Sequence, residues 1–131
     1  MPVKITPEYL AQSGTEHGHQ AALMCWCTDH VGTYSELDLL FAIPNGGLRN
    51  RATAARLRAE GVKRGVSDLF LPVARGGYHG LFIEMKKPGA KASEAQVEFG
   101  MKVEKQGYKF TVADSWDLAA QIILRYLKNN A

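Results

Sequence analysis

The chain has 131 residues, of which 46% are hydrophobic and 22% are charged, and its formal net charge is +3. These values exclude an intrinsically disordered chain and suit one domain, residues 1–131, built around a single hydrophobic core. Because no apolar run is long enough to cross a bilayer and the N-terminus lacks a secretory signal, we expect a cytoplasmic protein with no membrane partner.

Two helices are predicted near the N-terminus. Thr6 and Pro7 are typical of the cap and first turn of a short helix. A longer helix is expected from residue 13 or 15 to about residue 29, where apolar residues recur at helical spacing. Glu16 and Gln20 lie one turn apart on its apolar face, which is an unusual position for a carboxylate in a purely structural helix.

A strand and a basic helix are predicted next. Residues 37–43 (LDLLFAI) predict a strand that ends at a Pro-Asn-Gly-Gly turn. Residues 51–60 predict a helix that ends at Gly61. The basic residues of this segment are Arg49, Arg51, Arg56, Arg58, Lys63 and Arg64. Such a concentration of positive charge suits contact with a polyanion, although a solvated helix face explains it equally well.

Residues 65–87 predict a β-hairpin of two apolar strands. Asp68 lies near the start of the first strand, and Glu84 and Lys86 lie on one face of the second because strand side chains alternate. Charged groups in an apolar strand are costly to bury unless they are paired or bind a metal. Mg²⁺ binds carboxylate and carbonyl oxygens, so Asp68, Glu84 and the carbonyl of Met85 are candidate ligands. Metal sites of this kind can hydrolyse phosphodiesters, in which a water molecule attacks the phosphorus. Lys86 is a candidate for orienting that water.

The C-terminal part predicts a helix, a strand and a final helix. Ser93 and Gln96 form the pattern of a capping box that opens the first of these helices. Residues 108–113 alternate as in a strand, and residues 118–127 give the last helix a broad apolar face. The order α-β-α-β-β-α-β-α predicts a mixed α/β fold, with helices flanking a small central β-sheet.

The set Asp68 and Glu84-Met85-Lys86 resembles the D…(D/E)xK core of the restriction-endonuclease-like nucleases. More specific motifs surround it in the same order: IPNGG at 43–47, GVSDL at 65–69, FIEMKKPG at 82–89, Ser93 with Gln96, and Gly107-Tyr108. Together they resemble the virus-type replication-repair nuclease (VRR-NUC) domain over nearly the whole chain. Ser67 stands where this family usually has proline. This difference changes the stiffness of the backbone there but alters none of the expected metal ligands.

The resemblance implies a restriction-endonuclease-like core and an endodeoxyribonuclease that depends on Mg²⁺ or Mn²⁺, with no small-molecule cofactor. Glu16 matches a glutamate on the family's N-terminal helix, and Gln96 matches the glutamine that follows the Glu-x-Lys strand. The expected catalytic residues are Glu16, Asp68, Glu84, Lys86 and Gln96, and the expected metal ligands are Asp68, Glu84 and Met85. The expected nucleic-acid contacts are Gln20, Asn45, Arg49, Arg51, Lys63, Arg64, Lys87 and Lys91.

The chain resembles the stand-alone phage and bacterial members, which act on branched DNA such as Holliday junctions as homodimers. This implies a role in DNA repair or recombination, in a bacterium or a phage-infected cell. The apolar C-terminal helix is one candidate for the dimer interface, but core packing explains it equally well. A catalytically inactive DNA-binding module and a sequence-specific restriction-type nuclease remain alternative functions.

Simpler interpretations exist for several of these residues. Glu16 also suits the first turn of any helix, where the macrodipole favours an acid. Gln96 also completes a capping box, and both roles are compatible only if its side chain turns outward. The four histidines lack metal-ligand spacing and are expected at the surface or near DNA. They are His17, His19, His30 and His79.

Overall fold

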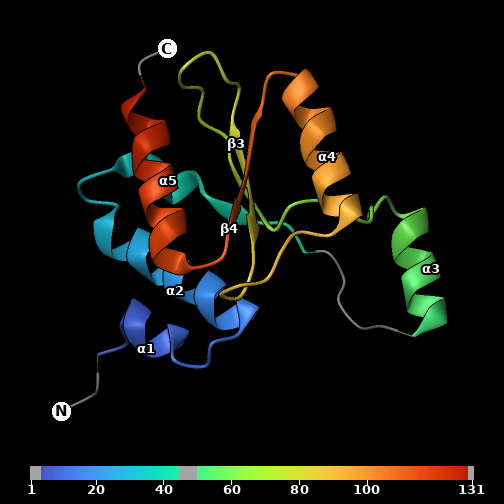
Figure 1. Cartoon of the computed structure of the whole chain (residues 1–131), viewed down its shortest axis with the longest axis horizontal. Helices are drawn as coiled ribbons and strands as arrows, with labels where there is room; N and C mark the ends of the chain where they lie inside the picture. The colour runs from blue at the N-terminus through green and yellow to red at the C-terminus, as the bar shows by residue number, and fades with distance from the viewer. Residues whose placement is uncertain (1–3, 45–49, 130–131) are drawn as a thin grey trace.

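The computed structural model describes residues 4–44 and 50–129 (Figure 1). Five α-helices, one 3₁₀-helix and four strands follow one another in these two segments. In chain order they are α1 Pro7–Ala11, α2 Glu16–His30, the 3₁₀-helix η1 Ser35–Leu39, β1 Phe41–Ala42, α3 Arg51–Ala59, β2 Leu69–Leu71, β3 Leu81–Met85, α4 Glu94–Lys105, β4 Lys109–Ala113 and α5 Trp116–Lys128. Within the described residues, none of the helices has the length and hydropathy needed to span a membrane.

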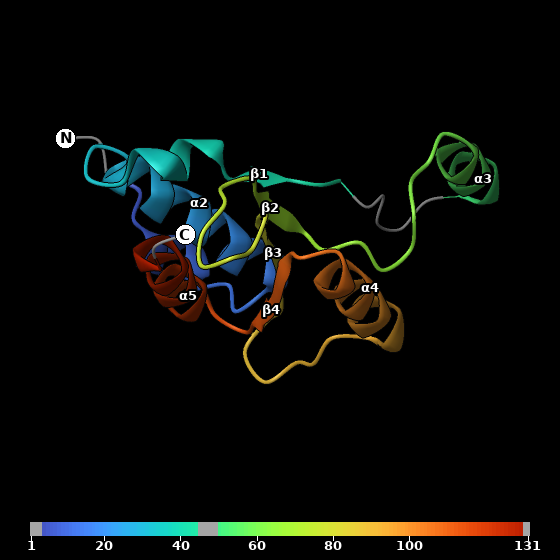
Figure 2. The same ribbon diagram turned by 90° about the horizontal axis from the view of Figure 1, so that it is seen from above.

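The four strands form one mixed sheet in the order β1-β2-β3-β4. β2 pairs antiparallel with both β1 and β3, and β4 pairs parallel with β3. Helices α2 and α5 cover one face of the sheet, and α4 covers the other (Figure 2). The predicted hairpin and the predicted class, a small mixed sheet flanked by helices, are therefore confirmed.

The hydrophobic core lies between the sheet and the helices α2 and α5. Leu69, Ile83 and Met85 of the sheet are fully buried against Leu23 of α2 and Ile123 of α5. Each such side chain stabilises the fold by roughly 1.5–3 kcal/mol relative to an exposed position. The apolar face of α5 therefore serves the core, which accounts for the pattern that also suggested a dimer interface.

The prediction of a strand over residues 37–43 is wrong for most of its length. The chain forms η1 as far as Leu39, and only Phe41 and Ala42 pair with β2. Leu37 and Leu40 point into the core while Leu39 is 50% exposed, so the buried positions are three residues apart instead of two. This three-residue spacing belongs to a 3₁₀-helix, and the main-chain bond from Leu40 N–H to the Leu37 carbonyl closes its last turn.

Side-chain caps begin α1 and α4 as the sequence predicts. The Thr6 hydroxyl accepts the N–H of Tyr9 at the start of α1, with Pro7 in the first turn. The Ser93 hydroxyl accepts the N–H of Gln96, whose side-chain carbonyl accepts the N–H of Ser93, so the capping box of α4 is complete. Thr15 and Ser115 cap α2 and α5 in the same manner.

Candidate metal centre

Asp68 lies directly before β2 and is held through both its main chain and its side chain. Its carbonyl accepts the N–H of Ile43 at 2.7 Å, and its Oδ2 accepts the N–H of Met85 at 2.8 Å. The pairing of Leu69 with Ile83 brings Asp68 opposite Glu84 at the end of the hairpin. These contacts leave the other carboxylate oxygen of Asp68 available to a ligand.

Gly65 keeps the segment before Asp68 close to α4. Gly65 has φ +87°, a backbone conformation that L side chains rarely adopt, and a Cβ there would lie 2.5 Å from the Ala95 carbonyl oxygen. Any other residue would push this segment away from the first turn of α4. The glycine of the GVSD motif therefore holds the segment that leads to Asp68 against α4, the helix that carries Gln96.

Glu84 is fully buried in β3, and neither of its carboxyl oxygens has a hydrogen-bond partner among the described residues. Lys86 Nζ lies 3.5 Å from Glu84 Oε2, in ion-pair contact. Burial raises the pKa of Glu84 to about 8, the nearby Asp68 carboxylate adds to the rise, and Lys86 opposes it. A buried, unsatisfied carboxyl beside a second acid is costly by itself and suits a bound cation.

Glu16 completes an acidic cluster with Asp68 and Glu84. It lies in the first turn of α2, and one carboxylate oxygen from each of the three residues lies within 4.8 Å of the others. Carboxylates grouped in this way can hold a hard divalent cation such as Mg²⁺ or Mn²⁺, with water completing the coordination. The residues present therefore fit a metal site, and helix α2, strand β3 and the segment before β2 contribute to it.

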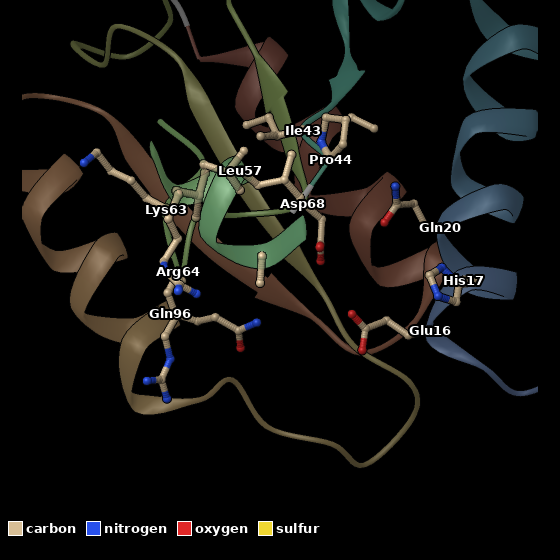
Figure 3. Close-up of a pocket in the computed structure, with 16 residues that line it drawn as sticks. Glu16, His17, Gln20, Ile43, Pro44, Leu57, Lys63, Arg64, Asp68 and Gln96 are labelled. Carbon is tan, nitrogen blue, oxygen red and sulfur yellow. The ribbon is translucent and has the colours of Figure 1, made fainter. Parts of the chain in front are cut away.

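Glu16 and Asp68 of the acidic cluster line a cavity of about 810 Å³ (Figure 3). Figure 3 shows Glu16, His17 and Gln20 on one side of this space, with Asp68 pointing into it. Lys63, Arg64 and Gln96 lie on the other side, and Arg58 also lines the cavity. We call Arg58, Lys63 and Arg64 the basic wall. The cavity thus combines a place for a cation with positive charge for phosphate groups.

Residues 10–117 match the family model described as the VRR-NUC domain. The chain belongs to the VRR-NUC family. A solved structure described as a VRR_NUC domain protein is 28% identical in sequence and has a TM-score of 0.73; the match covers 98% of this chain and 93% of that one. No curated protein matches the sequence. The predicted family is confirmed, so this VRR-NUC domain is a nuclease-family domain whose substrate class is DNA.

The structure of this VRR-NUC domain brings together part of the predicted set. Gln96 lines the cavity while its side-chain carbonyl also completes the capping box, and its role in the site stays a prediction. Lys86 lies one residue beyond β3, where its N–H bonds to the Ala113 carbonyl. The direction of the Met85 carbonyl stays a prediction. Asn45 and Arg49 lie outside the described residues.

Other predicted DNA contacts lie away from this cavity. Arg51 is exposed on α3, and Lys87 and Lys91 are exposed in the loop before α4; none of the three lines the cavity. His17 and Arg58 do line it, although neither is among the predicted site residues. The signal for both was their position beside predicted residues, since His17 follows Glu16 and Arg58 belongs to the basic segment.

The four histidines are predicted at the surface or near DNA, and His19 does not lie at the surface. Its side chain is buried, and Nδ1 accepts the main-chain N–H of Trp116 at 3.1 Å. His30 is half-buried and its Nδ1 lies 2.8 Å from the Trp26 carbonyl oxygen. The signal for His19 was its helical spacing from Leu23, which placed it on the face of α2 that meets α5.

Proposed function

We propose that this VRR-NUC domain is an endodeoxyribonuclease that depends on Mg²⁺ or Mn²⁺ and cuts branched DNA, such as Holliday junctions, as a homodimer. The observation that carries the catalytic part is the convergence of Glu16, Asp68 and Glu84 within 4.8 Å beside Lys86. The preference for branched DNA and the dimer rest on the motif resemblance to stand-alone members of the family.

The acidic cluster, with the Met85 carbonyl as a further ligand, would hold the divalent ion. When bound, such an ion polarises the phosphate and makes water a better nucleophile. Lys86 is half-buried beside Glu84 and can hold the attacking water, or stabilise the charge that develops as the phosphorus–oxygen bond breaks. Gln96 and Gln20 present amide groups to the same cavity, where they can orient the phosphate and its neighbouring sugar.

The basic wall supplies a second, independent part of the function. Arg58, Lys63 and Arg64 are exposed, and no described acid pairs with them. Cations that are not neutralised by the protein are available to DNA phosphates, and such contacts position the backbone without reading its sequence. Arg51, Lys87 and Lys91 can extend this grip over the surface, which suits a nuclease that selects the shape of its substrate.

The decisive experiment incubates the purified protein with junction, flap and linear DNA in Mg²⁺, Mn²⁺ or EDTA. We expect cleavage of branched DNA in either metal, none in EDTA, and a loss of roughly 10²- to 10³-fold in Lys86→Ala. Lys105→Ala, an exposed lysine on α4, is the matched control and should keep full activity. Binding without cleavage in both metals would indicate an inactive DNA-binding module. Discrete fragments from long duplex DNA would indicate a sequence-specific nuclease.

The homodimer has a separate test. Symmetric cleavage of two strands of a junction needs two active sites, which a two-fold dimer provides. Light scattering should give the mass of two chains, and a mixed dimer with one Asp68→Ala protomer should nick the junction once without separating it. Paired cleavage by a mixed dimer, or a monomer that resolves junctions, would contradict this part of the proposal.

A further inference from the structure

His19 is a buried polar residue that the proposed mechanism does not use. It lies on α2 one turn after Glu16, yet it does not line the cavity, and its side chain is only 7% exposed. Its Nδ1 accepts the main-chain N–H of Trp116 at 3.1 Å. Because a main-chain N–H can only donate, Nδ1 carries no proton and Nε2 carries the proton of the neutral ring.

The partner of His19 belongs to a turn that also holds the end of β3. This turn runs from Ala113, the last residue of β4, to Trp116, the first residue of α5. The Ala113 carbonyl accepts the N–H of Lys86 at 2.8 Å, and Asp114 Oδ2 accepts the N–H of Gly89 at 3.2 Å. The β4–α5 turn therefore joins α2 on one side to the strand end that carries Glu84 and Lys86 on the other.

Glu16 depends on such a connection more than the other two acids do. Asp68 and Glu84 face each other within one hairpin, whose register fixes their separation. Glu16 lies on α2, outside the sheet, so its distance from them follows from how α2 packs. His19 and Glu16 are three residues apart and move together with this part of the helix. A displacement of about 1 Å at a catalytic group is enough to cost about 10²-fold in rate.

We propose that His19 is a positioning residue: its hydrogen bond to the β4–α5 turn sets the distance of Glu16 from Asp68 and Glu84, and so sets the affinity of the centre for a divalent cation. The inference rests on the proposed metal centre and adds a residue outside the cavity to it. It differs from a general stabilising role, because it acts on cation affinity through Glu16.

The test measures Mn²⁺ binding to the whole chain by isothermal titration calorimetry. His19→Leu introduces an apolar side chain of similar size and leaves the Trp116 N–H without an acceptor. We expect it to bind Mn²⁺ roughly 10- to 100-fold more weakly, the usual effect of removing a residue that orients a metal ligand. His19→Asn places an amide oxygen near the position of Nδ1 and should restore most of the affinity. If the leucine variant does not fold, His19→Gln, whose amide reaches the Nε2 position instead, replaces it.

A double-mutant cycle separates positioning from stability. In a Glu16→Gln background, His19→Leu should cause no further loss of Mn²⁺ affinity, because the group it positions has already lost its charge. Leu23→Ala, a core change on the same helix, should lower the melting temperature without this loss of affinity. Unchanged affinity in His19→Leu, or an equal loss in both backgrounds, would overturn the inference and leave the metal centre standing. Absence of Mn²⁺ binding by the unsubstituted protein would overturn both.

Discussion

The acidic cluster and the basic wall border the same cavity but are held in very different ways. Glu84 is fully buried in a strand, and Asp68 is hydrogen-bonded through both its main chain and its side chain. The basic wall is exposed, and α3, which contributes Arg58, buries none of its residues and stands apart from the sheet (Figure 2). Chemistry at one phosphorus atom requires fixed geometry, whereas contact with a uniformly charged backbone tolerates freedom.

The largest difference should appear when each side loses charge. Asp68→Asn keeps the size of the side chain but removes a ligand charge from the acidic cluster. We expect DNA cleavage to fall to the level seen in EDTA, while DNA affinity measured by fluorescence anisotropy in Ca²⁺ changes little. Asp38→Asn, an exposed acid on η1, is the control and should cleave normally. Substantial cleavage by Asp68→Asn would show that cleavage does not require the full charge of the acidic cluster, and the functional difference between the cluster and the basic wall would be lost.

The burial of Glu84 predicts a pH-dependent stability for the protein in EDTA. The folded state raises the pKa of Glu84 from its ordinary value of 4.5 to about 8, so between these values the folded protein binds the extra proton. The contribution of Glu84 to the free energy of unfolding is therefore fully present below pH 4.5 and is lost as the pH rises through 8. The loss is at most about 1.4 kcal/mol per pH unit. Urea unfolding between pH 5 and 8 should show this slope, and Glu84→Gln should reduce it.

A divalent cation should oppose that pH dependence. Binding requires Glu84 to be ionised, so Mn²⁺ releases a proton and gains affinity as the pH rises towards 8. Unfolding repeated in Mn²⁺ should then give higher stability at pH 8 than in EDTA, with little gain at pH 5. An equal gain at both values would show that the cation binds elsewhere.

The basic wall should respond to salt more than to pH. Replacing Arg58, Lys63 and Arg64 by alanine should weaken binding to all DNA sequences alike. The slope of log affinity against log salt should fall by about 0.9 for each phosphate contact removed. Replacement of Lys102, Lys105 and Lys128, three exposed lysines on α4 and α5, makes the same change in net charge and should leave the slope near its original value. Equal effects of the two triple variants would indicate that only net charge matters.

The smallest expected effect concerns the link between Asp68 and α4. Gly65→Ala meets the Ala95 carbonyl in addition to an unfavourable φ, whereas Gly77→Ala has a similar φ of +86° and open space around it. Urea unfolding should show a cost of about 1 kcal/mol for Gly77→Ala and a larger one for Gly65→Ala. Only the Gly65 variant should also lower DNA cleavage, because it displaces the segment that leads to Asp68 from α4. An equal loss of stability in the two variants would show that α4 moves aside for the added Cβ at position 65 without a measurable energetic penalty.

Local patterns were predicted well because their interactions are local. The capping box of α4 closes within four residues, and the hairpin follows from two apolar runs and the turn between them. The sequence predicts a strand over residues 37–43 because LDLLFAI is apolar at a spacing of two residues as well as three. Only contact with the core selects the three-residue repeat of Leu37 and Leu40. Short apolar runs are ambiguous in this way whenever packing decides their period.

The sequence by itself determined the family, the mixed α/β class and the pairing of Asp68 with Glu84. The two residues meet because they lie at the end of one hairpin, whose neighbouring strands pair locally. The tertiary structure alone decided that Glu16 joins them within 4.8 Å, that the capping residue Gln96 also lines the cavity, and that His19 is buried against the β4–α5 turn. These contacts join residues far apart in the chain, and their geometry follows from how α2, α4 and α5 pack on the sheet, which no local pattern encodes.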